Sequence, residues 1–236
     1  MTKVLMIIPA YNEEESILKT VREITKYKKI KLDYLVINDG SSDETKRVCD
    51  SNNIKYVDLV NNLGIGAAVQ TGYKYAYDNN YDIAIQFDGD GQHDINYVND
   101  LIDAIVNDKC DMVIGSRFVG DVSKFKSTYF RRVGIKVLSF IIKILTGSEI
   151  KDVTSGYRAA NKKVIEKFAK NYVFDYPEPI TNLQLLKDGY KLKEVAVNMR
   201  ERQFGQSSIR LFKSVYYMLN VGLMLFIFGI GNGGRK

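Results

Sequence analysis

The residues best placed to do chemistry are Asp88 and Asp90, one residue apart in the string DGDGQH directly after an apolar run. Two carboxylates on one turn can share a hard divalent cation, and the amide of Gln92 adds a neutral oxygen. Without a cation, each like-charge pair with a diphosphate costs about 4 kcal/mol at ~4 Å and an effective dielectric of roughly 20. The string therefore predicts a Mg²⁺ or Mn²⁺ site that stabilises a diphosphate leaving group.

The elements that position these carboxylates alternate along the first half of the chain. Patterns typical of strands lie at 4–8, 35–37, 56–60, 83–87 and 112–114, and helical patterns lie at 13–26, 43–52, 67–77 and 97–107. This alternation predicts an α/β fold with a mainly parallel, doubly wound sheet flanked by helices. Such sheets bind ligands beyond the carboxyl ends of their strands.

Four loops rich in polar or small residues follow the first four predicted strands. They read PAYNE (9–13), NDGSSD (38–43), NNLGIG (61–66) and DGDGQHD (88–94). Two familiar nucleotide sites are excluded, because the first loop has no glycine for a dinucleotide fingerprint and no loop carries the lysine of a P-loop. Asn12 and Glu15 are spaced like a capping box and predict a helix start. The carboxylate turn therefore stays the candidate nucleotide site.

Composition indicates one sizeable domain with its own core. The chain has 236 residues, of which 45% are apolar and 26% charged, which excludes a disordered chain and a multi-span membrane protein. Two cysteines exclude a disulfide scaffold. The apolar run at the amino terminus is shorter than that of a signal peptide, so we expect a reduced, cytoplasmic setting.

Charge is distributed unevenly along the chain. Residues 1–120 carry 13 Lys and Arg against 19 Asp and Glu, whereas residues 121–236 carry 21 against 9. A basic half is typical of proteins that meet phosphates, nucleic acid or anionic membranes. Here the cations lie beside long aliphatic runs and not on aromatic base-stacking platforms, so nucleic acid is not an expected partner.

Several motifs together resemble a known family. They are PAYNE (9–13), INDGS (37–41), DGDGQH (88–93), GSR (115–117), DVTSGYR (152–158) and RQFGQSS (202–208). This set resembles the family-2 glycosyltransferases of GT-A fold, and specifically their polyprenyl-phosphate branch, which is similar to dolichol-phosphate mannosyltransferase. The resemblance spans about residues 4–210. It implies an enzyme that transfers a sugar with inversion.

The resemblance also implies roles for individual residues. The residues expected to hold the nucleotide donor are Pro9, Tyr11, Glu13, Ile37, Asp39, Asp88 and Arg202, those expected to hold the metal are Asp88, Asp90 and Gln92, and those expected at the reacting groups are Asp152 and Arg117. Separately from the resemblance, Arg131 and Arg132 on the predicted helix at 129–145 are expected to meet the lipid phosphate. One departure is Ser208, where the mannosyltransferases often carry lysine. Both UDP- and GDP-linked donors therefore stay open.

A phosphate acceptor changes what the protein must supply. Its second pKa is near 6, so it is largely ionised at pH 7 and needs no strong base. Asp152 matches a position proposed as a base in the family, and the alternative is that it orients Arg158 or another guanidinium. Glu178 is a weaker candidate base, because a carboxylate at a helix start explains it equally. His93, the sole histidine, is either a site residue or a structural residue of the turn.

Two segments of the second half predict contact with a membrane. Around residues 129–145, a helix would gather Arg132, Lys136, Ser139 and Lys143 on one stripe beside a broad apolar arc, as in helices that lie in lipid headgroups. Residues 215–230 are strongly apolar but shorter than the ~20 residues of a spanning helix. We therefore expect a transferase domain over 1–210 and an apolar membrane-associated segment over 211–236.

The leading hypothesis is transfer of a sugar from a nucleotide donor to polyprenyl phosphate at the cytoplasmic face of the membrane. One alternative is an enzyme that extends a cell-surface glycan on a saccharide hydroxyl, and another is a catalytically silent membrane adaptor. Expected partners are a UDP- or GDP-linked sugar, polyprenyl phosphate and the membrane surface, with a small integral membrane protein or a second copy of the chain as further partners.

Overall fold

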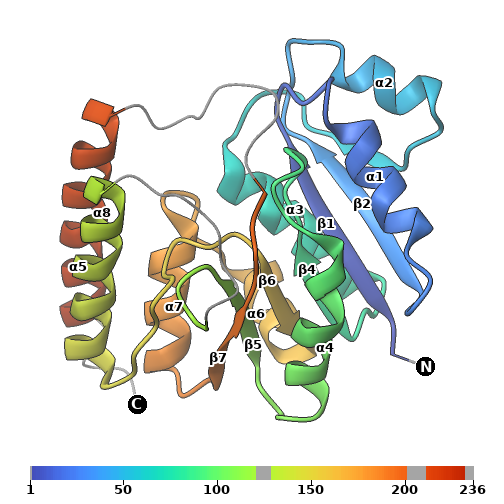
Figure 1. Ribbon diagram of the computed structural model, residues 1–236. Coiled ribbons are helices and arrows are strands. Elements are labelled where there is room, and N and C mark those ends of the chain that lie inside the picture. Colours follow the sequence, from blue (N-terminus) through green and yellow to red (C-terminus); the bar gives the residue numbers. More distant parts are fainter. Residues whose placement is uncertain (1, 121–128, 201–210, 232–236) are drawn as a thin grey trace.

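The computed structural model describes residues 2–120, 129–200 and 211–231, which build one sheet covered by helices on both faces (Figure 1). The sheet has seven strands in the order β3-β2-β1-β4-β6-β5-β7. The strands are β1 (Val4–Ala10), β2 (Leu32–Asn38), β3 (Tyr56–Asp58), β4 (Ile83–Gln86), β5 (Met112–Ser116), β6 (Arg158–Asn161) and β7 (Leu192–Ala196). The predicted α/β class is confirmed.

The sheet is mixed because one strand is reversed. β6 pairs antiparallel with β4 on one side and with β5 on the other, whereas all other neighbouring strands pair in parallel. The prediction of a mainly parallel sheet therefore holds for six strands. The strands β6 and β7 come from the second half of the chain, where the sequence patterns assigned no strand.

Helices divide between the two faces of the sheet. They are α1 (Ile17–Lys26), α2 (Thr45–Ser51), α3 (Ile65–Asp78), α4 (Val98–Val106), α5 (Tyr129–Thr146), α6 (Lys162–Lys170), α7 (Pro177–Lys187) and α8 (Leu211–Gly231), with a short 3-10 turn at Ile95–Tyr97. One apolar core lies between the sheet and α1 and α4. The other lies between the sheet and α3, α5, α6, α7 and α8. Each predicted helix of the first half is present, with shifted ends.

The strand β1 shows why its sequence is apolar throughout. All seven of its residues are buried. Leu5 and Ile7 point into one core, and Met6 and Ile8 point into the other, because successive side chains of a strand alternate between faces. A central parallel strand is covered on both sides and reads as a continuous apolar run. The loop after β1 therefore begins at the carboxyl end of an interior strand, between the ends of β2 and β4.

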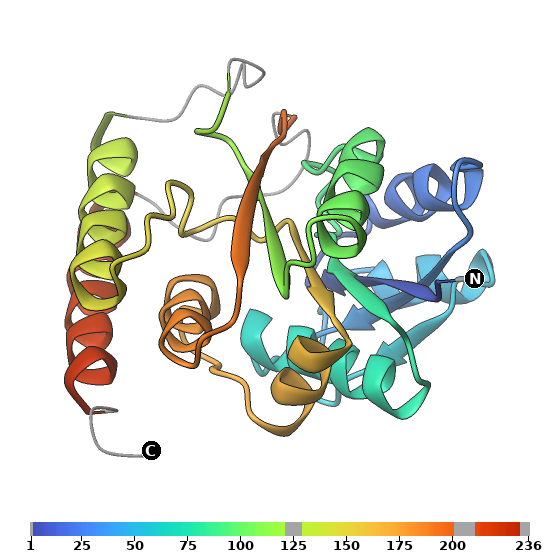
Figure 2. The same cartoon turned by 90° about the horizontal axis from the view of Figure 1, so that it is seen from below.

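The helices α5 and α8 pack side by side, with α7 between them and the sheet (Figure 2). Val221 and Leu225 of α8 are fully buried in this packing. At Gly134 of α5, the side chain of Met218 lies so close that an added methyl group would stand 2.8 Å from it. Within the described ranges, no helix has the length and apolar character needed to cross a membrane.

Candidate active site

The carboxyl ends of β1 and β2 hold a polar corner. The backbone N–H of Asp39 donates to the carbonyl of Ala10 at 2.9 Å, and its buried carboxylate accepts from the N–H groups of Leu63 and Gly64, both at 2.9 Å. Gly64 has φ of +88°, a conformation that side chains rarely adopt. Asp39 thus fixes the loop that starts α3 against the end of β1.

The loop after β1 does not form the predicted capping box. Asn12 has φ of +56°, its N–H donates to Ser41 Oγ at 2.9 Å, and its side-chain oxygen accepts from the N–H of Ser42 at 2.8 Å. The helix α1 begins later, at Ile17. The capping prediction was wrong because the side chain of Asn12 joins two strand-end loops and is not available to a helix end.

The residues predicted to hold the nucleoside lie together in this corner. Pro9 and Ile37 are register partners on neighbouring strands. Tyr11 is 47% exposed, whereas Glu13 is buried and accepts from Ser16 Oγ at 2.6 Å. Tyr11 thus offers an exposed aromatic ring, while Glu13 and Asp39 are buried and held by hydrogen bonds. Their contact with a nucleoside stays a prediction.

The carboxylate turn follows β4 at the same edge. Gln86 Nε2 donates to Asp88 Oδ1 at 3.1 Å, and the N–H of Gln92 donates to Asp90 Oδ1 at 3.0 Å. Both aspartates are partly exposed. Hydrogen bonds from Gln86 and Gln92 therefore orient the two carboxylates, which stay in contact with solvent.

His93 holds this turn from beneath. Its Nδ1 accepts from the N–H of Asp88 at 3.0 Å, and its ring stacks on Tyr157 with centroids 4.6 Å apart. Burial lowers the pKa of His93 to about 4, although the negative charge of Asp90 acts in the opposite direction. The ring is thus neutral at pH 7, as expected for a structural residue of the turn.

The donor set of the turn fits a hard divalent cation. Asp88 and Asp90 offer carboxylate oxygens, the ligand type that Mg²⁺ and Mn²⁺ prefer. Among the residues that the structure describes, no group of three or more His, Cys, Asp or Glu side chains gathers to hold a metal. A pair of carboxylates suits a cation that keeps several ligands from water or from substrate phosphates. The predicted site therefore fits a metal shared with a ligand.

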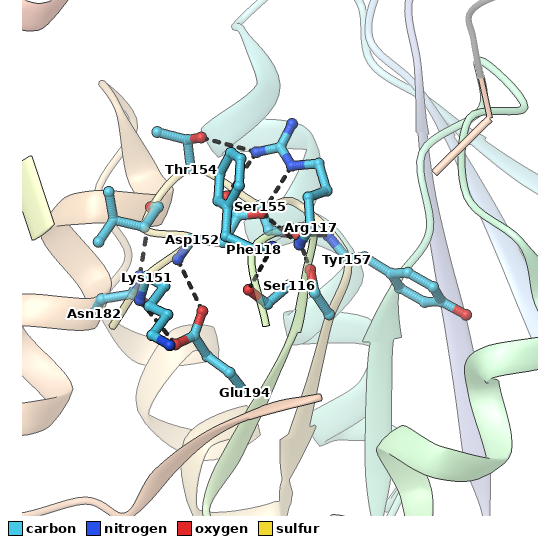
Figure 3. Close-up of polar contacts among 12 residues, drawn as sticks. Ser116, Arg117, Phe118, Lys151, Asp152, Thr154, Ser155, Tyr157, Asn182 and Glu194 are labelled. Carbon is cyan, nitrogen blue, oxygen red and sulfur yellow. Dashed lines mark hydrogen bonds and ion pairs between the residues drawn. The ribbon is translucent and has the colours of Figure 1, made fainter. Parts of the chain in front are cut away.

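Across from the turn, Arg117 and Asp152 form a buried ion pair (Figure 3). Arg117 donates from Nε to Asp152 Oδ2 and from Nη2 to Asp152 Oδ1, both at 2.7 Å, and its backbone N–H also donates to Oδ2 at 2.9 Å. Nη2 also reaches Thr154 Oγ1 at 3.0 Å. Asp152 is 0% exposed. Bidentate pairing of this kind fixes the plane of the guanidinium.

This geometry favours one of the two roles considered for Asp152. Both carboxylate oxygens are bound to Arg117, and neither reaches solvent, so the group orients a guanidinium and has no access to an acceptor proton. The guanidinium is that of Arg117. Arg158 instead donates to Asn182 Oδ1 at 2.7 Å and to Thr181 Oγ1 at 3.0 Å.

A single segment, residues 152–157, connects the ion pair with the carboxylate turn. It begins at Asp152, stacks Tyr157 on His93, and places Gly156 against the side chain of Asp88. A methyl group built on Gly156 would lie 3.0 Å from Asp88 Oδ2 and 2.9 Å from Gln86 Nε2. A side chain at this position therefore requires Gln86 and Asp88 to shift by a few tenths of an ångström.

We expect Gly156→Ala to lower catalytic turnover about tenfold, since the added methyl group moves Asp88 by a few tenths of an ångström and a full misplacement of about 1 Å can cost about a hundredfold. Circular dichroism and thermal melts should show a folded protein, and Gly222→Ala, at a helical glycine whose added methyl group meets only Ile141 Cδ1 at 3.9 Å, is the control. Full activity of Gly156→Ala would show that Asp88 needs no fixed position.

Glu178 lies below the turn at the start of α7. Gln86 donates a hydrogen bond to it, and burial raises the pKa of Glu178 while the guanidinium of Arg158 opposes that shift. Sequence patterns did not reveal that Gln86 bridges Glu178 and Asp88. A polar residue at the end of an otherwise apolar strand was the available signal.

The remaining predicted residues are placed in part. Arg131 lies in the first turn of α5 and is half-buried. Gln92 donates from Nε2 to the carbonyl of Arg200 at 3.4 Å, which links the carboxylate turn to the chain after β7. Arg202 lies outside the described residues.

Known proteins match this chain over most of its length. Residues 6–169 match the model of glycosyl transferase family 2. The UDP-N-acetylglucosamine--dolichyl-phosphate N-acetylglucosaminyltransferase of Methanococcus voltae is 33% identical over 181 residues, which cover 69% of this chain and 71% of that protein. The polyprenol monophosphomannose synthase of Mycolicibacterium smegmatis is 28% identical over 219 residues, covering 88% and 81%.

Solved structures share the fold. Glucosyl-3-phosphoglycerate synthase from Mycobacterium tuberculosis, in complex with Mn²⁺, UDP and glucosyl-3-phosphoglycerate, superposes with a TM-score of 0.69 at 17% sequence identity. The match covers 98% of this chain and 80% of that one. The GT-A-like architecture expected from the motifs is thus confirmed.

Proposed function

This chain belongs to glycosyl transferase family 2, and from that premise we propose that it transfers a sugar from a nucleotide donor to polyprenyl phosphate. The single observation that carries the proposal is the segment 152–157, which ties the partner of Arg117 to the turn of Asp88 and Asp90. The same short segment therefore supports both sides of the proposed site. One side is the metal site for the diphosphate of the donor, and the other is the guanidinium of Arg117 for the phosphate of the acceptor.

The donor side draws on the carboxylate turn. Asp88 and Asp90 would hold Mg²⁺ or Mn²⁺, which neutralises charge on the departing diphosphate. The structural neighbour was solved with Mn²⁺ and UDP, and the relative from Methanococcus voltae is named for a UDP-linked sugar. These names favour a UDP-linked donor, while the relative named as a mannose synthase keeps a GDP-linked donor as the alternative.

The acceptor side draws on Arg117. Its guanidinium is held in one plane by Asp152, and Arg131 is the second cation proposed to meet the acceptor. An ionised phosphate is itself a nucleophile, so orientation and charge neutralisation supply the catalysis. Relatives named for dolichyl phosphate, polyprenol and undecaprenyl phosphate favour this acceptor class.

A saccharide hydroxyl is the competing acceptor, and the geometry of Asp152 disfavours it. A hydroxyl must lose its proton to a base within hydrogen-bond reach. Asp152 is fully buried and engaged at both oxygens, so it does not serve that need. The silent adaptor is disfavoured by the two oriented carboxylates at the strand edge, which fit a metal.

We further propose that the enzyme works at the cytoplasmic face of the membrane. The support is an outer apolar surface, formed by exposed side chains of α5 and α8. These side chains are Val133, Val137, Phe140, Ile144, Leu223, Phe226 and Ile227. They lie on two helices that pack side by side, and large exposed apolar patches mark interaction sites. A small integral membrane protein or a second copy of the chain are the other occupants that this surface would accept.

The test is to incubate the full chain with Mg²⁺ or Mn²⁺, polyprenyl phosphate in detergent, and a panel of UDP- and GDP-linked sugars. We expect one donor to yield a glycolipid whose sugar is attached through phosphate and has inverted configuration. Omission of the metal should abolish the product. A product formed only with saccharide acceptors, or none with any donor, would overturn the proposal.

A further inference from the structure

The helix α5 uses its four sides differently. Ile135, Leu138 and Ile142 face the core and are fully buried. Gly134 faces α8. A third side exposes the apolar residues of the outer surface, and a fourth carries cations at the spacing of one helical face. The predicted polar stripe is therefore present, whereas Leu138, Ile141 and Leu145 of the predicted apolar arc pack against the core.

A pocket of about 400 Å³ opens along the cationic side. Its wall is formed by Arg132, Lys136 and Lys143 of α5 together with Lys151 from the loop before β6. The floor is apolar and includes Phe118, the residue after Arg117. Two separate segments of the chain thus bring basic side chains to one cavity.

The charge of this pocket is poorly balanced by the protein itself. Glu149 is the one carboxylate in its lining, and it pairs with Lys143 at 3.4 Å. Within the described part of the chain, Arg132, Lys136 and Lys151 make no ion pair with a carboxylate. Four cations face one acidic group, so a bound anion is electrostatically favoured.

The pocket also adjoins the apolar surface. Phe140 lines the pocket and is 63% exposed, and it lies on the same helix as Val137 and Ile144, which belong to the outer surface. An anion that carries acyl chains would place its phosphate among the cations and its chains along this surface. A free phosphate would contact the cations but would gain nothing from the apolar surface.

We propose that this pocket binds the phosphodiester headgroup of an anionic phospholipid of the bilayer and so fixes how the enzyme is oriented on the membrane. The inference rests on the membrane surface proposed above, but not on the transfer reaction or the acceptor. An anionic phospholipid fits the pocket because its phosphate complements the cations and its acyl chains can continue along the apolar surface.

The test compares binding of the full chain to vesicles of phosphatidylcholine alone and of phosphatidylcholine with phosphatidylglycerol, at fixed ionic strength. Lys136→Gln/Lys151→Gln should weaken binding to the anionic vesicles by about 25-fold, since each cation near such a surface contributes about fivefold. The control Lys74→Gln/Lys163→Gln removes the same charge at exposed positions on α3 and α6 and should bind like the unaltered protein.

Two further measurements separate the sources of phosphate. By calorimetry, short-chain phosphatidylglycerol below its micelle concentration should bind saturably, and Lys136→Gln/Lys151→Gln should lose this binding. Equal binding of inorganic phosphate would assign the pocket to a free anion and overturn the proposal. So would a double variant with unchanged vesicle binding and a raised KM for polyprenyl phosphate in detergent, because the pocket would then belong to the acceptor. Failure of sugar transfer itself leaves these binding readouts intact.

Discussion

Asp88→Asn is expected to lower sugar transfer about a thousandfold and to weaken Mn²⁺ binding in parallel. The asparagine keeps the size of the side chain and an oxygen that can accept from Gln86. It removes the negative charge that attracts a divalent cation. The rate is measured with saturating donor, and Mn²⁺ binding is measured by electron paramagnetic resonance in the presence of UDP.

The matched control for that variant is Asp78→Asn, which removes one carboxylate from the exposed end of α3. It should leave both the rate and Mn²⁺ binding unchanged. If Asp88→Asn also transfers sugar at the normal rate and binds Mn²⁺ normally, the carboxylate turn is not the metal site.

Asp152→Asn should lower the free energy of unfolding by about 3–5 kcal/mol, because it leaves the charge of a buried guanidinium without its partner. Transfer by the fraction that folds should fall about a hundredfold as Arg117 loses its fixed plane. Denaturant titration gives the first quantity, and initial rates normalised to folded protein give the second.

The dependence of rate on pH distinguishes positioning from base catalysis in this variant. If Asp152 orients Arg117, the residual rate keeps the pH profile of the unaltered enzyme. Loss of one limb of the profile would instead identify Asp152 as the base. Arg117→Met/Asp152→Leu is the stability control, since replacing both partners by apolar residues recovers much of the stability. It should fold well and transfer no better than Asp152→Asn.

Much of the fold was predictable because alternation of strands and helices reports on the layers of an α/β domain. Hydrophobic patterns in the sequence do not show the order or the direction of the strands within the sheet. The reversed strand β6 is a short sequence, RAAN, with no turn signal that marks its direction. Its place between β4 and β5 depends on packing of the whole chain and was not readable.

The site was predictable at the level of loops. Strand ends share one edge, so the polar residues after β1, β2 and β4 had to meet. The pairing of Arg117 with Asp152 was not predictable, because the two positions are 35 apart in the sequence and Arg158 was the only partner of Asp152 that was named from the sequence. The start of α1 lies later than predicted, because the side chain of Asn12 accepts a hydrogen bond from Ser42 in a neighbouring loop and does not cap the helix.

The two segments that were predicted to contact a membrane illustrate a different limit. Helical spacing on α5 predicted which residues share a side, and the cations Arg132, Lys136 and Lys143 do line one pocket. Spacing alone does not tell which apolar sides are covered by other helices. Ile135 and Phe140 are both apolar residues of α5, yet one is buried against the core and the other is 63% exposed.

The short segment from Asp152 to Tyr157 runs directly into β6, a strand held on both flanks by neighbours in the middle of the sheet. The arginine that pairs with its first residue and the aspartate beside its glycine are thus supported by one stretch of backbone. We therefore expect a substitution that alters the preference for one substrate to change the kinetics of the other substrate as well. Variants selected for a new acceptor should show altered donor kinetics as well, and compensating substitutions should gather in this hexapeptide.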